Sequence, residues 1–394
     1  MTILSRYVLR ELLLVFSLVL GALTLFMLVV VLVKEAQQQG LGLAQILLLV
    51  PYSLPEAMRY AVPGTMLFAA ASVFGRMSAS NEITALRAAG VSPLTVIWPA
   101  AGLAIVASFV SVWLNDLAVS WGRDGFRRVV VESVEQIVYS RLRQQRSYST
   151  DSLAINVTAV DGRRLIRPTL WLKNGPGGAQ ATVSAAEAEL RANLTAGTLV
   201  VTFRDGDLHM GDVKASFPDT IVRELPFGAV SRKDTASTSP SEIPMADLAR
   251  ARAEQITRIE QLDQAIAGKR AVAMLTGALY VTTPAAVAAD RAALAEARGR
   301  LTRIVLEPWR RWANGFSCLC FVLVGAPMAI RMRNADFLTS FFLCFLPILV
   351  VYYPVFMLGV DQAKRGAIPP VAVWLGNVLI AIWGWWLLRR VVRA

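Results

Sequence analysis

The sequence predicts a membrane α-helical bundle with six transmembrane helices, joined to an extracytoplasmic all-β domain of jelly-roll type and a helical hairpin. Three observations predict it: 55% of the residues are hydrophobic, six runs are long and apolar, and a long polar segment separates the third run from the fourth. A helix needs about 20 apolar residues to cross a hydrocarbon core of about 30 Å. The predicted spans are Leu12 to Val33, Pro51 to Gly75, Leu94 to Leu114, Trp312 to Ile330, Phe337 to Val360 and Ile368 to Leu388.

The first run is longer than the apolar region of a secretory signal, and no small-residue cleavage pattern follows it. We expect it to be retained as a span. When six spans alternate, the arginines of the short flanks fall on one side, which the positive-inside rule makes cytoplasmic together with both termini. The net charge of +12 then requires no nucleic acid. The arginines are Arg6, Arg10, Arg76, Arg87, Arg331, Arg333, Arg389, Arg390 and Arg393.

Residues 1–114 are predicted to hold spans one to three, and residues 307–394 to hold spans four to six. Between them, residues 115–240 contain short runs of alternating apolar and polar side chains. Turn sequences such as Asp161-Gly162 and Asp205-Gly206 separate these runs. Period-two alternation with such turns is typical of antiparallel strands, so this part is predicted to be a β sandwich or jelly roll.

Residues 241–306 follow a Ser-, Thr- and Pro-rich linker at Ser231 to Pro244. The apolar residues of this part recur at helical spacing in two arms, Met245 to Gly268 and Pro284 to Val305, which predicts an α-hairpin. The hairpin is interpreted as a packed helical pair, with a docking site for a partner as the alternative.

A short polar helix is predicted over residues 76–90, between the second and third spans. Ser80 is expected to cap it, Glu82 lies in the first turn where the helix dipole favours an acid, and Gly90 ends it before Pro93. A helix of this length is marginal alone in water and needs a surface on which to dock.

Residues four positions apart share a face of this helix. Glu82 and Leu86 therefore offer an acid and an apolar side chain to a groove, and Ile83 and Arg87 offer an apolar side chain and a base from an adjacent face. A loop helix lying on the membrane surface is the alternative interpretation.

No motif in the chain supports catalysis. The sequence Ala267-Gly-Lys-Arg270 lacks the further glycine and the Ser or Thr of a nucleotide-binding loop, so ATP and Mg²⁺ are expected on another chain. His209 is the only histidine and has no spaced His or Cys partners, which argues against a zinc site. A serine nucleophile would lack its usual base. We expect neither an enzyme nor a cofactor in this chain.

Three charged residues lie at membrane depth or close to it, where charge is costly and often marks a path or a partner. Lys34 lies at the outer end of the first span, and Glu56 and Arg59 lie one turn apart at the start of the second. The alternatives are a lysine that reaches the lipid headgroups and a Glu56–Arg59 ion pair that is purely structural.

The chain resembles the permeases of the lipopolysaccharide-export ABC transporter, LptF and LptG. The resemblance rests on three segments: Phe74-Gly-Arg-Met-Ser-Ala-Ser-Asn-Glu-Ile-Thr-Ala-Leu-Arg-Ala-Ala-Gly-Val-Ser, Glu307-Pro-Trp-Arg-Arg-Trp leading into Gly325-Ala-Pro-Met-Ala-Ile-Arg, and Gly366-Ala-Ile-Pro-Pro-Val-Ala-Val-Trp-Leu-Gly-Asn377. The order of three spans, outer β domain and three spans also matches. The short motifs leave open which of the two paralogues is closer.

The resemblance implies a bacterial inner-membrane permease that extracts lipopolysaccharide and passes it to a periplasmic jelly-roll bridge. It implies two further partners, a second permease in a heterodimer or homodimer and a dimeric cytoplasmic ATPase that holds ATP and Mg²⁺. Residues 76–90 then form the coupling helix, with its ATPase contacts among Arg76, Glu82, Ile83, Leu86, Arg87 and Gly90. The substrate cavity would include Phe26, Lys34, Arg59 and Phe68.

One departure from the family is the length of the hairpin arms from Met245 to Val305, which exceeds the usual connection. Two other functions stay open at this point. One is the permease of a different lipid or lipoprotein-releasing ABC system. The other is a non-transporting membrane scaffold with an outer binding module.

Overall fold

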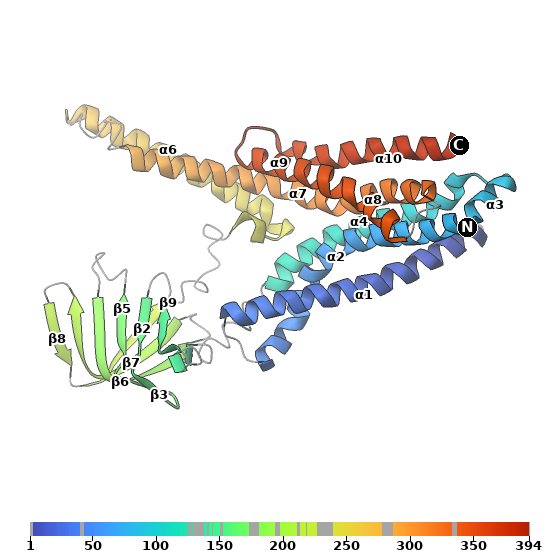
Figure 1. Cartoon of the computed structure of the whole chain (residues 1–394). Coiled ribbons are helices and arrows are strands. Elements are labelled where there is room, and N and C mark those ends of the chain that lie inside the picture. The colour runs from blue at the N-terminus through green and yellow to red at the C-terminus, as the bar shows by residue number, and fades with distance from the viewer. Residues whose placement is uncertain are drawn as a thin grey trace. The chain divides into compact units, whose positions relative to one another are not determined.

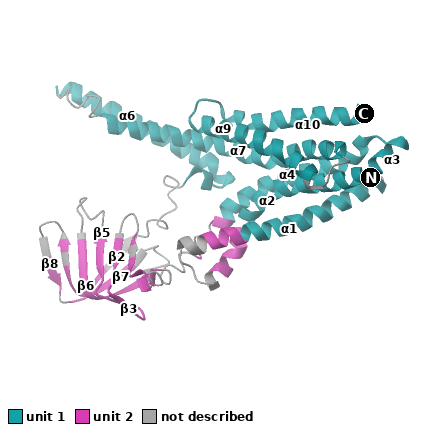
Figure 2. Ribbon diagram, in the orientation of Figure 1, with its two compact units in different colours: residues 1–28, 54–121, 235–394 teal, residues 29–53, 122–234 magenta. Residues whose placement is uncertain are grey.

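The computed structural model divides the chain into two compact units (Figure 2). The first comprises residues 1–28, 54–121 and 235–394, and the second comprises residues 29–53 and 122–234. The structure describes residues 3–39, 43–123, 125, 129, 138–139, 142–143, 145–149, 153–172, 181–193, 198–210, 213–217, 219–226, 239–277, 287–332 and 337–393.

Helices build most of the first unit, and the second unit contains the strands (Figure 1). The α-helices are α1 (Ile3–Gln39), α2 (Leu43–Ala79), α3 (Glu82–Ala88), α4 (Pro93–Leu117), α6 (Met245–Leu275), α7 (Ala288–Arg331), α8 (Phe337–Pro347), α9 (Tyr353–Lys364) and α10 (Leu375–Arg393). Shorter 3₁₀ and π segments are η1 (Ala118–Gly122), η3 (Pro240–Glu242), η5 (Ile348–Tyr352) and η6 (Pro370–Trp374).

Within the described residues, five helical segments are long and apolar enough to cross a membrane. They are Ile3–Lys34, Pro93–Gly122, Ala288–Arg331, Thr339–Lys364 and Pro370–Arg393. The second predicted span lies in α2, which is a continuous helix of 37 residues but is not among the five. Its Glu56 and Arg59 and its many small residues lower its hydropathy. The count of six spans therefore stays a prediction.

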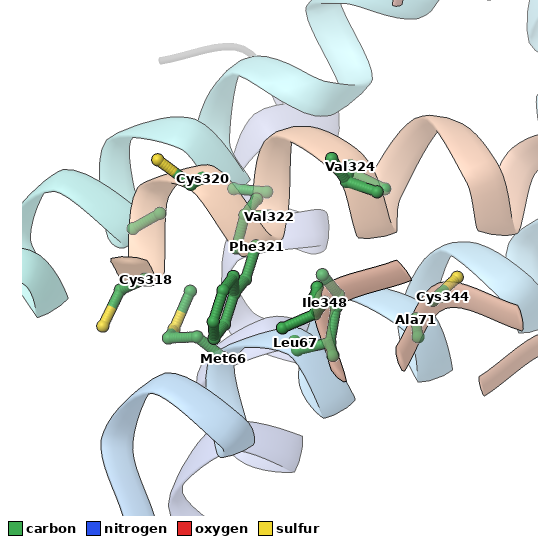
Figure 3. Packing of buried hydrophobic residues seen from close by; sticks show 14 of the residues in the cluster. Met66, Leu67, Ala71, Cys318, Cys320, Phe321, Val322, Val324, Cys344 and Ile348 are labelled. Atoms are coloured by element: carbon green, nitrogen blue, oxygen red, sulfur yellow. The ribbon is translucent and has the colours of Figure 1, made fainter. Parts of the chain in front are cut away.

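The core of the helical unit lies where α2, α7 and η5 meet. Figure 3 shows Met66 and Leu67 of α2 beside Phe321 of α7 and Ile348 of η5. Close packing of these side chains provides dispersion contacts between the helices, and it removes their apolar surface from contact with lipid or water. The free thiols of Cys318, Cys320 and Cys344 are buried in the same core.

Two glycines allow helices of this core to approach closely. A Cβ at Gly315 of α7 would lie 2.3 Å from the Val112 side chain of α4, and a Cβ at Gly384 of α10 would lie 2.8 Å from the Leu323 carbonyl oxygen of α7. Small residues at helix contacts are typical of membrane bundles because they let backbones pack directly. The helix α7 is therefore held between α4 and α10.

The helices α6 and α7 form the predicted hairpin. The Gln255 side-chain amide of α6 donates to the Ala297 carbonyl of α7 at 2.9 Å, and Lys269 pairs with Asp290 at 2.8 Å. The structure has no break at the predicted boundary between residues 306 and 307, because α7 runs through it as one helix of 44 residues. The second arm of the hairpin and the fourth predicted span therefore belong to one continuous helix, α7.

The predicted linker at Ser231 to Pro244 is described by the structure from Ser239 onward. Residues 231–238 lie outside the described residues, but η3 follows at once and Ile243 is buried with Leu248 and Ile304. This contact holds the start of α6 against α7.

The second unit contains an antiparallel sheet whose described strands number nine. Six of them follow the order β1-β2-β5-β6-β4-β3, and the long strand β7 pairs with β6, β8 and β9. The strands are β1 (Ser147–Ser149), β2 (Leu153–Asn156), β3 (Ala159–Asp161), β4 (Arg164–Ile166), β5 (Thr169–Leu172), β6 (Ala181–Asn193), β7 (Thr198–Met210), β8 (Val213–Phe217) and β9 (Ile221–Pro226). The antiparallel β character predicted for this part is confirmed, and the jelly-roll topology stays a prediction.

One buried face of the sheet, including Ile155, Leu190 and Phe203, packs with Tyr139. The Tyr139 hydroxyl donates to the Arg163 carbonyl at 2.6 Å and accepts from the Leu190 amide at 3.0 Å. The unit therefore has a core of its own, as expected for a folded domain without disulfides.

Two predicted turn sequences differ in outcome, and a third, Asn174 to Gly178, lies outside the described residues. Asp161-Gly162 connects β3 to β4, with Gly162 at φ 58°, as predicted. Asp205-Gly206 is not a turn, because β7 continues through it along β6. Gly206 is needed there since a Cβ would lie 2.3 Å from the Ser184 carbonyl oxygen of β6. A glycine that permits close strand approach resembles a turn glycine in sequence.

Candidate functional site

The segment predicted as one helix over residues 76–90 is divided at Asn81. Arg76 belongs to the last turn of α2, Asn81 has a left-handed φ of 60°, and α3 then spans only seven residues before Gly90 at φ 80°. Asparagine tolerates the left-handed conformation better than most residues. The prediction of one continuous helix is therefore wrong, although a helix begins at Glu82 as expected from its place in the first turn.

Ser80 does not cap α3. Its hydroxyl lies 2.9 Å from the Arg76 carbonyl oxygen and 3.0 Å from the Glu82 carboxylate, so its one proton can be donated to either acceptor. The residue at the N-cap is Asn81, whose side chain makes no cap hydrogen bond. Ser80 thus links the end of α2 to the first residue of α3.

Three of the side chains predicted to contact another chain are engaged within the bundle. Ile83 is 4% exposed and belongs to the helical core, and Leu86 packs against the same core. The Arg87 guanidinium donates to the Val391 carbonyl of α10 at 2.6 Å. In this chain, α3 is therefore anchored by the residues at positions 83, 86 and 87.

The remaining residues of the segment are more accessible. Glu82 is half-buried, and Thr84, Ala85 and Ala88 are exposed. Arg76 pairs with Glu11 of α1 at 2.6 Å, so α2 is fixed to α1 directly before the α3 turn. Glu82 is the acid that α3 presents at its start.

A cavity of about 520 Å³ lies beside α3. It is lined by residues of α3 and by the C-terminal turns of α7 and α10, among them Arg87, Arg331, Arg390 and Arg393. We call it the arginine pocket. The sequence offered only a partial signal for it, because these arginines were explained by the positive-inside rule and nothing in their spacing indicated that they meet.

The predicted substrate residues lie in different surroundings. Phe26 on α1 is 61% exposed, whereas the Phe68 ring packs 5.3 Å from the Phe341 ring of α8. Lys34 is exposed near the end of α1. Within this chain, Phe68 takes part in internal packing and Phe26 faces outward.

Arg59 is occupied by neighbours in the helical unit. Its guanidinium pairs with Glu56 at 2.9 Å, donates to the Tyr60 hydroxyl at 2.8 Å, and reaches the Asn115 amide oxygen of α4 at 3.4 Å. The Glu56–Arg59 pair considered as a structural alternative is therefore present.

A buried charge cluster joins α4, α7 and η3. Arg311 of α7 is 1% exposed, contacts the Asp116 carboxylate of α4 at 3.2 Å, and lies 3.6 Å from Glu307. Glu307 is also buried and accepts from Arg310 at 2.7 Å. We call Arg311, Asp116, Glu307 and Arg310 the Arg311 cluster. Three of its residues lie in the sequence motif Glu307-Pro-Trp-Arg-Arg, and Asp116 does not. Within the motif, only the i,i+4 spacing of Glu307 and Arg311 could have indicated a pair.

The Arg311 cluster also satisfies backbone groups at the base of the hairpin. Arg311 donates to the Ile243 carbonyl at 2.6 Å, and the Met245 amide donates to the Asp116 carboxylate at 2.8 Å. A buried charge is costly unless it is paired and hydrogen-bonded, and here both conditions are met.

Metal binding finds no support in the described part of the chain, where no three His, Cys, Asp or Glu side chains gather as ligands. His209 lies half-buried in β7, opposite Thr182 of β6 and Lys214 of β8.

Comparison with protein families matches residues 6–390 to the family described as lipopolysaccharide export system permease LptF/LptG. A search of curated proteins found no match. The family is one of transport permeases that form part of an Lpt ABC system with other subunits, and the apolar helices fit a multi-pass protein of the inner membrane. Because the match covers nearly the whole chain, this protein belongs to the LptF/LptG family of lipopolysaccharide export permeases.

Proposed function

We propose that this chain is the permease subunit that converts ATP-driven movement of a separate ATPase dimer into extraction of lipopolysaccharide from the inner membrane. ATP and Mg²⁺ bind to the ATPase and not to this chain. Six spans, including α2, cross the membrane with both termini in the cytoplasm, and the β unit is a periplasmic jelly roll that passes the lipid to a bridge protein of similar fold. Family membership supports a role in lipopolysaccharide transport, and the contacts described below assign parts of that role to individual residues of this chain.

The observation that carries the proposal is the anchoring of α3. A helix of seven residues has little stability alone, so it depends on the contacts of Ile83 and Arg87 with the bundle. Force applied to Glu82 would pass through Arg87 to α10. It would also reach α7, since Ser78, close before α3, donates to the Ile330 carbonyl at 2.7 Å.

Uneven burial of the spans supports a second permease as partner. Only 11% of the most apolar window of α1 and 22% of that of Thr339–Lys364 are buried within the chain, against 72% for α7. The outward side chains on these two segments include Phe26, Phe342 and Leu346. We propose that these two segments face the second permease across the lipid cavity, where Phe26 and Lys34 contact the substrate.

Charge reversal at Glu82 tests the coupling role. Glu82→Lys should leave the subunit folded but lower the amount of ATPase that copurifies with it by at least about tenfold, because a complementary pair becomes repulsive. The measurement is ATPase copurification, followed by lipopolysaccharide extraction from proteoliposomes.

The matched control is Glu254→Lys on α6, an exposed acid outside α3 that pairs with Arg250 one helical turn away. This variant should behave as the unmodified chain in both assays. Normal ATPase association and transport by Glu82→Lys would contradict the proposed role of α3.

A further inference from the structure

The arginine pocket lies beside the coupling contact proposed for Glu82 but is not lined by that residue. It lies in the helical unit at the end of the bundle where both termini and α3 are found (Figure 1). Its walls come from four elements, namely the end of α2 at Ser78, α3, the end of α7 and the end of α10. A ligand in this pocket would therefore contact several helices at once.

The charge of the pocket is strongly positive. Four arginines line it, Arg87, Arg331, Arg390 and Arg393, and none of the described lining residues is acidic. Among the described residues, none of the four forms an ion pair with a carboxylate, and the Nε atom of Arg87 is buried without a hydrogen-bond partner. Converging guanidinium groups of this kind are suited to phosphate, which accepts several charge-assisted hydrogen bonds.

The pocket also has an apolar wall. Ile83, Ile330 and Val391 line it, and all three are buried. Beside it on α10, Arg390 stacks on Trp386 at 3.8 Å and Arg389 on Trp385 at 5.2 Å. Tryptophan and arginine side chains at a helix end are typical of the membrane–water interface. Phosphate and hydrocarbon are thus both accommodated at headgroup depth.

We propose that the arginine pocket binds the headgroup phosphate of an anionic phospholipid of the cytoplasmic leaflet, with its acyl chains along the outer surface of α10. The inference rests on the proposed orientation, which places α3 at the cytoplasmic side. Basic pockets between transmembrane helices on this side suit anionic headgroups. The bound lipid would join α3 to the ends of α7 and α10 and hold the coupling segment in position.

Free inorganic phosphate shares the anionic group but lacks the acyl chains, so the apolar wall favours the lipid. An acidic segment of the ATPase is a different class of ligand, and its binding would be an outcome that overturns the proposal. Because lipid retention can be measured without ATPase, nucleotide or lipopolysaccharide, failure of this inference is distinguishable from failure of the transport function.

The test uses the full chain reconstituted in nanodiscs that contain phosphatidylglycerol and phosphatidylethanolamine in equal amounts. Native mass spectrometry after gentle delipidation measures which lipid stays bound. The expected result is preferential retention of phosphatidylglycerol by the unmodified chain. The double variant Arg390→Gln and Arg393→Gln should reduce that preference by at least about tenfold, since each cation near a membrane surface contributes to anion attraction.

The matched control is Arg389→Gln, which removes an arginine from the same helix end but not from the pocket lining. It should retain phosphatidylglycerol as the unmodified chain does. Gel filtration of all three proteins checks that they are folded. Equal losses in the control and the double variant, or no preference in the unmodified chain, would overturn the proposal.

A competition arm separates the sources of phosphate. Inorganic phosphate at millimolar concentration should leave phosphatidylglycerol bound, because it has no acyl chains to contact the outer surface of α10. Full displacement by inorganic phosphate would assign the pocket to a soluble anion, and displacement by added ATPase without nucleotide would assign it to the protein partner. Either result would overturn the lipid proposal.

Discussion

The two ends of α4 lie beside arginine clusters that are built in opposite ways. At its C-terminal end, Arg311 is buried and compensated by Asp116 and Glu307. Near its N-terminal end, α3 and the last turns of α7 and α10 surround a cavity with four arginines and no acidic residue among its described lining. Positive charge is neutralised within the chain at one end and left available at the other.

This difference separates structural charge from functional charge. A buried cation with its own carboxylates and backbone acceptors can fix one arrangement of helices, but it has no capacity left for a ligand. Exposed cations around a cavity contribute little to folding and can bind an anion. We therefore expect substitutions in the Arg311 cluster to change stability, and substitutions in the arginine pocket to change binding.

The largest effect is expected from Arg311→Met. It leaves the carboxylates of Asp116 and Glu307 without their buried partner, and loss of one member of such a pair costs about 3–5 kcal/mol. Thermal unfolding in detergent, followed by tryptophan fluorescence, measures the loss. Arg365→Met serves as control because the Arg365–Asp361 pair is exposed and should contribute less than about 1 kcal/mol.

A second substitution sharpens this prediction. Adding Asp116→Asn to Arg311→Met removes the carboxylate whose ion pair is lost, whereas Glu307 stays paired with Arg310, so the double variant should be more stable than Arg311→Met alone. If Arg311→Met were no more damaging than Arg365→Met, the cluster would not have the structural role given to it.

An intermediate effect is expected from Arg87→Gln. This residue belongs to the pocket but also donates to the Val391 carbonyl, and loss of one hydrogen bond costs about 1 kcal/mol. We expect a small fall in unfolding temperature together with weaker ATPase coupling, measured as the ratio of lipid extracted to ATP hydrolysed. A stability loss as large as that of Arg311→Met would contradict the distinction between a structural Arg311 cluster and an arginine pocket that serves binding.

The smallest effect on stability is expected from Thr84→Glu. Thr84 lines the pocket and is exposed, so a carboxylate there would relieve repulsion among the arginines by less than about 0.5 kcal/mol. The same change should lower phosphatidylglycerol retention, because it supplies the missing acid. Ala88→Glu, on the same helix but outside the lining, is the control; equal retention by both variants would count against the pocket's selectivity for anions.

Much of the helical unit could be predicted because long apolar runs leave few alternatives to a span. The Arg311 cluster limited this prediction. Glu307, Arg310 and Arg311 interrupt the apolar pattern, so the sequence suggested a boundary where α7 is continuous. The pairing of these charges with one another and with Asp116 allows Glu307 and Arg311 to be buried within the helix.

The coupling segment shows a second limit. Helical spacing correctly grouped Ile83 with Arg87 on one face, but it could not say what that face contacts. The partner of Arg87 is a carbonyl 304 residues away, at Val391. Likewise the identity of Asn81 was compatible with a left-handed conformation, but a single asparagine did not suffice to predict that the helix divides there.

The continuity of α7 has a mechanical consequence. At about 1.5 Å per residue, its close contact with α4 at Gly315 lies about 24 Å from Arg331 and about 40 Å from Ala288. A straight rod tilting about that contact would move its hairpin end about 1.7 times as far as its pocket end, and in the opposite direction. Paired spin labels at the two ends would reveal whether Pro308 absorbs this motion. A small displacement of the α7 end beside α3 would therefore produce a larger displacement of its hairpin end.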